Sequence, residues 1–149
     1  MFTMNVMEIN ASRDAVFRLA AEVDRWPEIL PHYRWVKKWQ VDGHIITEMA
    51  AKRDFILLKW LSIQEVDAER CVIRYRHIGG ATTGMDVEWL FLENGPKVTA
   101  VVIHEWHPTW WLPAAIRRGI TFLIGELFIR VVADRTLRHI KRQAELQAL

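Results

Sequence analysis

Two histidines, His77 and His104, have the clearest potential for chemistry in this sequence. Imidazole is the side chain whose ordinary pKa lies nearest neutrality, so a histidine in a cavity can take up or release a proton during a reaction. Turn signals at Gly79-Gly80 and Asn94-Gly95 separate the strands that carry these residues. Counting along the hairpins predicts His77, Met85 and His104 in one row on the same face of a sheet.

An apolar cavity around this row would lower the pKa of both imidazoles and keep them neutral near pH 7. One of them could then serve as an acid/base catalyst or orient a carbonyl group. The alternative is structural, with both histidines buried and hydrogen-bonded to a hydroxyl, to water or to each other. Both interpretations are compatible with the sequence.

The run His-Glu-Trp-His at residues 104–107 looks like a metal motif but does not have the right geometry. Side chains three positions apart on a strand point to opposite faces, so His104 and His107 cannot converge on one ion. The sequence also lacks a glycine-rich phosphate loop and a G-x-S-x-G nucleophile motif. We predict no metal and no other cofactor.

Alternating apolar and polar residues predict a series of strands separated by short turns, which is typical of an antiparallel meander. The expected strands are Phe2–Asn10, Tyr33–Val41, His44–Asp54, Phe55–Val66, Arg70–Ile78, Met85–Leu92 and Lys97–Trp106. Two short helices should follow the first strand. Ser12 is a typical N-cap for one, and Pro27 suits the first turn of the other.

The segment from Pro113 to about Gln147 predicts one long helix, which only Gly119 and Gly125 weaken. From Ile120 to Val132 it is apolar on nearly every side, so we expect this half to be enclosed by the rest of the protein. From Ala133 onward it is more basic, and we expect this half to emerge along the surface.

An antiparallel sheet with one solvated face needs its other face covered, and the C-terminal helix is the only element large and apolar enough. The pattern therefore predicts an α+β fold in which a curved antiparallel sheet wraps around that helix. Residues 1–149 should form a single domain, as is usual for this length.

A cavity between sheet and helix is expected to have walls from both. We favour an inward orientation for Trp60 and Ser62, although the pattern of their strand is ambiguous, and we could not choose a face for residues 33–54. The expected ligand-binding residues are Trp60, Ser62, Tyr75, Met85, Val87, Trp89, Trp106, Ile120, Leu123, Leu127 and Val131, with His77 and His104 as possible catalysts.

The eight tryptophans are many for 149 residues and indicate a thick core or an apolar cavity. Trp110 and Trp111 lie just before the long helix. They could form a cavity rim, a contact with a membrane, or a homodimer contact together with the C-terminal helix.

The net charge of +2 is too small to indicate a nucleic-acid-binding protein. The single cysteine cannot form an internal disulfide and suits a reducing compartment. We see no signal peptide and no apolar run long enough to span a bilayer. These observations favour a cytoplasmic protein.

The stretch from Ile9 to Trp39 resembles the START-related superfamily of polyketide cyclases and lipid-transfer proteins. It shares with them an Ile-x-Ala-x-x-x-x-Val-Phe pattern at Ile9–Phe17 and a Val-Asp-Arg-Trp-Pro run at Val23–Pro27. The segments Trp60–Ser62, Gly84–Trp89 and Leu137–Lys141 also fit, so the resemblance covers nearly the whole chain.

This resemblance implies the helix-grip fold of START and Bet v 1-like proteins, whose functions vary widely. In the aromatase/cyclases of the superfamily, a cavity arginine on the strand equivalent to His44–Asp54 is important, and Glu48 stands near that place here.

Three functions are expected from these patterns. The first is binding of a hydrophobic small molecule, such as an aromatic polyketide, a lipid or a quinone. The second is a cyclase or dehydratase that folds a poly-β-ketone chain, with His77 or His104 as acid/base. The third is a peripheral membrane or dimerisation module.

Overall fold

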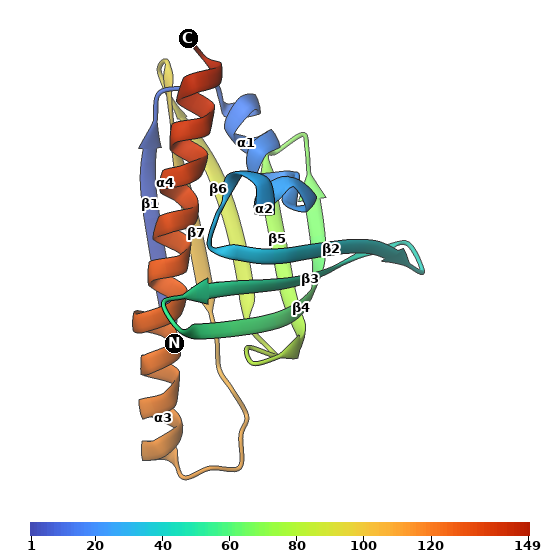
Figure 1. Ribbon diagram of the computed structural model, residues 1–149, viewed down its shortest axis with the longest axis vertical. Coiled ribbons are helices and arrows are strands. Elements are labelled where there is room, and N and C mark those ends of the chain that lie inside the picture. The colour runs from blue at the N-terminus through green and yellow to red at the C-terminus, as the bar shows by residue number, and fades with distance from the viewer.

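A computed structural model describes all residues 1–149 and contains one antiparallel sheet, two short helices and one long C-terminal helix (Figure 1). In chain order the elements are β1 (Phe2–Ile9), α1 (Arg13–Ala21), the 3-10 turn η1 (Val23–Arg25), α2 (Trp26–Ile29), β2 (Tyr33–Val41), β3 (His44–Arg53), β4 (Ile56–Asp67), β5 (Val72–Gly80), β6 (Asp86–Asn94), β7 (Lys97–Glu105), α3 (Ala114–Phe122), the π-helical segment η2 (Leu123–Ile129) and α4 (Arg130–Gln147).

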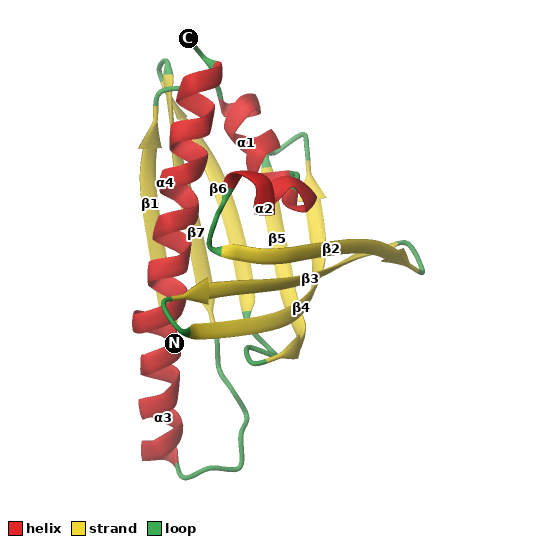
Figure 2. Ribbon diagram, viewed as in Figure 1, coloured by secondary structure: helices red, strands yellow, loops and turns green.

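The seven strands form a single sheet in the order β1-β7-β6-β5-β4-β3-β2. Every neighbouring pair is antiparallel. The sheet curves around α4, and the short helices lie over the same concave side (Figure 2). The predicted α+β class and the sheet wrapped around a helix are therefore confirmed.

Local signals place the short helices as the sequence predicts. The Ser12 side chain accepts a hydrogen bond from the backbone N–H of Ala15, which caps α1. Pro27 lies in the first turn of α2, where its missing N–H costs nothing. These helices cover one end of the concave face. At the other end, the C-terminal helix alone lies over the sheet (Figure 2).

The register of the β5–β6 hairpin is as predicted, with ion pairs on the outer face. The carboxylate of Glu88 lies 2.7 Å from the Arg74 guanidinium, and that of Asp86 lies 2.5 Å from Arg76. This pairing directs Tyr75 and the residues two positions away on either side toward the concave face.

The predicted register of β6 and β7 is wrong by two residues. Lys97 pairs with Asn94 rather than with Leu92, so His104 lies opposite Val87 and not opposite Met85. The strands extend further into the Asn94-Gly95 turn than we expected. A shift of two preserves the inward or outward direction of each side chain, so His104 still belongs to the inner face.

The C-terminal helix is continuous from Ala114 to Gln147, but the expectation for its two halves is wrong. The second half is the one that the sheet and α1 enclose, since Leu137, Ile140 and Ala144 are completely buried. The first half projects beyond the sheet (Figure 1). A narrow stripe of apolar residues in α4 is sufficient for burial, whatever the charge of its other sides.

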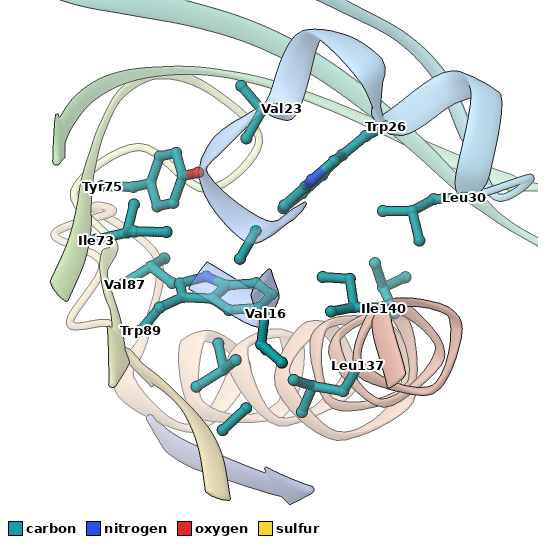
Figure 3. Packing of buried hydrophobic residues seen from close by; sticks show 14 of the residues in the cluster. Val16, Val23, Trp26, Leu30, Ile73, Tyr75, Val87, Trp89, Leu137 and Ile140 are labelled. Atoms are coloured by element: carbon teal, nitrogen blue, oxygen red, sulfur yellow. The ribbon is translucent and has the colours of Figure 1, made fainter. Parts of the chain in front are cut away.

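Buried apolar side chains from α1, α2, α4 and the sheet meet in the interior (Figure 3). Trp26 packs against Trp89, with ring centroids 5.8 Å apart, and the Trp26 indole donates a hydrogen bond to the Leu19 carbonyl. Val16 and Leu30 complete this region without measurable exposure. None of the helices is both long and apolar enough to cross a bilayer.

Candidate functional site

A cavity of about 60 Å³ lies between the concave face of the sheet and the first turns of α4. It is mostly apolar, and its lining comes from α2, six strands, the β5–β6 turn, η2 and α4: Trp26, Tyr33, Met49, Leu58, Trp60, Tyr75, His77, Thr82, Met85, Val87, Trp89, Val102, His104, Phe128, Ile129, Val132, Ala133 and Thr136. This volume holds a few water molecules, whereas typical ligand pockets have about 300–1,000 Å³. A larger ligand therefore enters only if wall side chains such as the half-buried Trp60 and Leu58 move.

Two histidines form one polar region of the wall. The Nδ1 atom of His77 lies 2.6 Å from the Thr82 hydroxyl, and the Trp60 indole stacks on the His77 ring at 5.7 Å. His104 lies on the same face, with a buried Nδ1 atom that has no hydrogen-bond partner. Its unsatisfied nitrogen is available to a polar atom of a ligand.

Burial controls the charge of these two rings. The pKa of His77 is lowered to about 3, mainly because the side chain is buried and further because His104 is nearby. The pKa of His104 is lowered to about 4 by burial. Both imidazoles are therefore neutral near pH 7 and can donate or accept hydrogen bonds, but they are weak bases.

A second polar region contains two tyrosines. The Tyr75 hydroxyl accepts a hydrogen bond from the Gln64 amide at 3.0 Å, which leaves its own proton free to donate. Burial raises the pKa of both Tyr33 and Tyr75 above the ordinary range, so both remain protonated. The region can donate hydrogen bonds to a carbonyl oxygen.

Thr136 connects this region to α4. Its hydroxyl donates a hydrogen bond to the Val132 carbonyl at 2.8 Å. The hydroxyl oxygen therefore accepts the hydrogen bond from His32 Nε2 at 2.9 Å. The pKa of His32 is lowered to about 4, first by burial and then by the charges of His139 and Arg135. A neutral His32 thus holds the Thr136 hydroxyl at the cavity wall.

Part of the predicted site lies where the sequence placed it. Seven of the predicted residues line the cavity: Trp60, Tyr75, His77, Met85, Val87, Trp89 and His104. Ser62 points inward and is fully buried, but it does not reach the cavity. Trp106 is buried beyond the end of β7, where its indole donates to the Thr83 carbonyl and its ring contacts Trp110 edge-on.

The predicted helix residues Ile120, Leu123, Leu127 and Val131 do not line the cavity. Leu123 and Leu127 are about half exposed, and the helix contributes Phe128, Ile129, Val132, Ala133 and Thr136 instead. The π-helical turn of η2 is one reason, because its wider spacing rotates the following residues relative to a regular helix. The other is that α3 extends past the sheet, so Ile120 has no sheet opposite it.

Strand β3, whose orientation the sequence left open, contributes Met49 to the cavity. Arg53 lies four residues further along the same face of β3. The guanidinium of Arg53 donates a hydrogen bond to the Leu127 carbonyl, so it joins the β3–β4 turn to η2. Glu48 points outward, 3.7 Å from Lys37 and from Lys59. Alternation from the buried Met49 would have identified Arg53, but the choice of face was not evident from the sequence.

No three histidine, cysteine, aspartate or glutamate side chains lie close enough together to hold a metal ion. His107 is exposed and lies 3.3 Å from Glu105, on the opposite side of the strand from His104. The chemistry that this site offers is hydrogen bonding by neutral groups in an apolar surrounding.

A seven-stranded sheet gripping a C-terminal helix, with a largely apolar cavity between them, defines a helix-grip protein of the START and Bet v 1-like class. Residues 9–141 match the family "Polyketide cyclase / dehydrase and lipid transport", and the chain belongs to this family. A search of curated proteins for similar sequences gave no match.

Solved structures agree with this fold. The Thermus thermophilus protein TTHA0849 is similar with a TM-score of 0.82 at 17% identity, over 100% of both chains. The Zhui aromatase/cyclase of a Streptomyces species has a TM-score of 0.82 at 17% identity, covering 100% of this chain and 96% of that one. A START superfamily protein of Mycobacterium smegmatis has a TM-score of 0.71 at 13% identity, covering 98% of each chain.

Proposed function

We propose that this protein binds a hydrophobic small molecule that carries at least one carbonyl or hydroxyl oxygen. The observation that carries the proposal is the cavity at the helix–sheet interface, whose apolar wall is interrupted by separate polar regions around His104 and Tyr75. Aromatic polyketides, quinones and lipids with a polar end all have this character. The family description, which includes lipid transport, supports the same class of ligand.

Binding alone is favoured over acid/base catalysis by the pKa values of the histidines. A general base works best with a pKa near the working pH, whereas those of His77 and His104 are lowered to about 3 and about 4. These rings are better suited to positioning a ligand oxygen than to removing a proton. The low pKa values therefore leave recognition as the main role.

Titration calorimetry with a naphthoquinone, a hydroxyanthraquinone and a long-chain fatty acid tests the proposal. We expect at least one of them to bind with one-to-one stoichiometry. The variant Tyr75→Phe should weaken binding of a carbonyl ligand about fivefold to tenfold, the value of one hydrogen bond. Ile73→Val, a change on the same strand outside the cavity, is the control. The absence of saturable binding by all three ligands would refute the proposal.

Polyketide cyclisation is the second candidate, and the partnerless Nδ1 of His104 together with the Zhui aromatase/cyclase neighbour favours it. In this function the neutral His104 would hydrogen-bond an enol or ketone oxygen of a folded chain. Turnover of a linear poly-β-ketone mimic, lost in His104→Gln and retained in His107→Gln, is the expected result. The third expectation, contact with a membrane or a second copy, concerns the surface outside the cavity.

A further inference from the structure

The end of the molecule next to the cavity exposes large apolar side chains from three segments. Phe55 in the β3–β4 turn and Trp111 in the β7–α3 loop are each 91% exposed. Along the helix, Ile116, Leu123 and Leu127 are about half exposed and lie on one face because of their helical spacing. Several large apolar side chains exposed at one end of a molecule are typical of an interaction surface. We call these five residues the apolar tip.

The three segments are held together by hydrogen bonds. The Arg53 guanidinium donates to the Leu127 carbonyl, which fixes the β3–β4 turn beside η2. The Arg117 guanidinium donates to the Trp110 carbonyl at 3.0 Å, which fixes the β7–α3 loop beside α3. In Figure 1 the turn lies next to the helix where α3 begins to project from the sheet. The apolar tip is thus a preformed surface.

The tip and the cavity wall are built from the same two segments. The exposed Leu127 precedes the cavity residue Phe128 in η2. Strand β4, which follows Phe55, contributes Leu58 to the cavity wall, while the exposed Leu57 before it points to the opposite face of the sheet.

The charge of the segments around the apolar tip indicates which kind of partner suits this surface. Segments 52–59 and 111–127 carry the cationic residues Lys52, Arg53, Lys59, Arg117 and Arg118, and their only acidic residues are Asp54 and Glu126. Glu126 is paired with Arg130 at 2.7 Å, Arg53 lies 3.9 Å from Asp54, and Lys59 lies 3.7 Å from Glu48. Lys52, Arg117 and Arg118 are the cations of these segments that have no acidic partner. A second copy that docked by two-fold symmetry would place like charges against each other, whereas an anionic lipid surface attracts them. Protruding aromatic side chains also suit the interface of a bilayer better than a flat protein surface.

We propose that the apolar tip docks onto an anionic lipid bilayer, so that the cavity exchanges its ligand with the membrane. The ligand exchange rests on the proposed function, but the docking does not. Phe55, Trp111 and the helix stripe enter the interfacial region, and the surrounding arginines and lysines contact the lipid phosphates.

Co-sedimentation with vesicles tests the docking without any ligand. We expect the protein to bind vesicles of equimolar phosphatidylcholine and phosphatidylglycerol, and to bind pure phosphatidylcholine at least fivefold more weakly, the value of about one cationic contact. Trp111→Ser and Leu123→Ser should each lower the partition coefficient about tenfold. Each substitution removes an apolar side chain that the lipid would bury, and we expect about half of the free energy of full burial to be lost. Arg118→Gln should lower it about fivefold for the anionic vesicles only.

Matched controls lie at the other end of the molecule. Leu92 is 55% exposed, close to the 53% of Leu123, so Leu92→Ser changes the same amount of apolar surface away from the tip. Arg142→Gln is the corresponding control for charge. Vesicle binding that is absent, or that falls equally in Leu92→Ser and Leu123→Ser, would overturn the proposal. A dimer in light scattering that dissociates with Leu123→Ser would overturn it too, because the stripe would then be a self-contact.

The docking proposal and the ligand-binding proposal can be refuted independently of each other. Tip variants should retain titration of a naphthoquinone from solution if the cavity binds it. Tyr75→Phe should retain vesicle binding, because Tyr75 is buried inside the sheet. Loss of vesicle binding in Tyr75→Phe without any loss of thermal stability would contradict the assignment of docking to the tip.

Discussion

Ala133 and Ala144 lie on the same inward side of α4, eleven residues apart in sequence, yet they meet different surroundings. Ala144 is completely buried and belongs to the hydrophobic core where α1 covers the helix. Ala133 lines the cavity, where the helix and the sheet do not fill the space between them. We call these two regions the packed end and the cavity end.

The difference separates stability from function along one helix. At the packed end the short helices supply Val16, Trp26 and Leu30 as a further layer between α4 and the sheet (Figure 3). At the cavity end Trp26 is the only residue of the short helices that reaches the wall, and partnerless polar atoms such as His104 Nδ1 remain in it. We expect substitutions at the packed end to affect folding and those at the cavity end to affect binding.

Leu137→Ala should have the largest effect on stability. Leu137 is completely buried at the packed end, and truncation of such a leucine costs about 2–5 kcal/mol because of lost burial and the cavity left behind. Affinity for a naphthoquinone should not change at a temperature where the variant is folded. Chemical denaturation and calorimetry check the two parts. A loss below about 1 kcal/mol would mean that this end is not tightly packed.

Trp89→Ala should have an intermediate effect on stability, because Trp89 belongs to both regions. One side of its ring packs against Trp26, and the residue also lines the cavity. We expect a loss of about 2–3 kcal/mol, less than the 3–5 kcal/mol of an enclosed aromatic, since one side already lacks protein contacts. Ligand affinity should fall as well. A full core-sized loss with unchanged binding would show that the ring is only filler.

Lowering the pH should destabilise the cavity end. The pKa values of His77 and His104 are lowered from 6.5 to about 3 and about 4, so the unfolded state binds more protons than the folded state in this range. The stability that the neutral rings contribute is therefore full above pH 6.5 and is lost as the pH falls toward 4. Because both pKa values lie well below the ordinary one, the loss should amount to several kcal/mol for the pair by about pH 4.

Unfolding by urea between pH 7 and pH 4 measures this loss, with the double variant His77→Gln/His104→Gln as reference. The variant should lose less stability than the wild type over this interval. His107→Gln, at an exposed position, should follow the wild-type curve. Parallel curves for the wild type and the double variant would contradict burial as the cause of the lowered pKa values.

Most of the fold could be predicted from the sequence because its signals are local. Alternation and turn residues located every strand to within a few residues, and Ser12 and Pro27 located the short helices. The register of β6 and β7 was less certain, since a slip by two residues leaves every side chain on the same face of the sheet.

The helix face could be predicted less well. Local hydrophobicity suggested that Ile120, Leu123 and Leu127 face the sheet, but which part of a helix is covered depends on where the sheet ends. The π-helical turn at Leu123–Ile129 then changes the side that Phe128 presents, and no residue pattern signalled it. Tyr33 and Thr136 were not predicted as cavity residues, because they are far apart in sequence and come together only in the folded chain.

The central claim is that the cavity beside Ala133 holds a ligand, whereas Ala144 is enclosed by packed side chains with no cavity beside it. The pair Ala133→Leu and Ala144→Leu tests it with the same added volume on the same helix. Ala133→Leu should change stability by less than about 1 kcal/mol, because the cavity accepts the side chain, whereas Ala144→Leu should cost about 1–3 kcal/mol through overpacking.

Fluorescence titration of both variants with anilinonaphthalene sulfonate, under conditions where both are folded, is the most direct measurement. The wild type and Ala144→Leu should bind the dye saturably with the same affinity, and Ala133→Leu should lose at least tenfold in affinity, since the added leucine occupies the ligand's space. Equal dye affinity in Ala133→Leu and the wild type would contradict a ligand site between the sheet and α4.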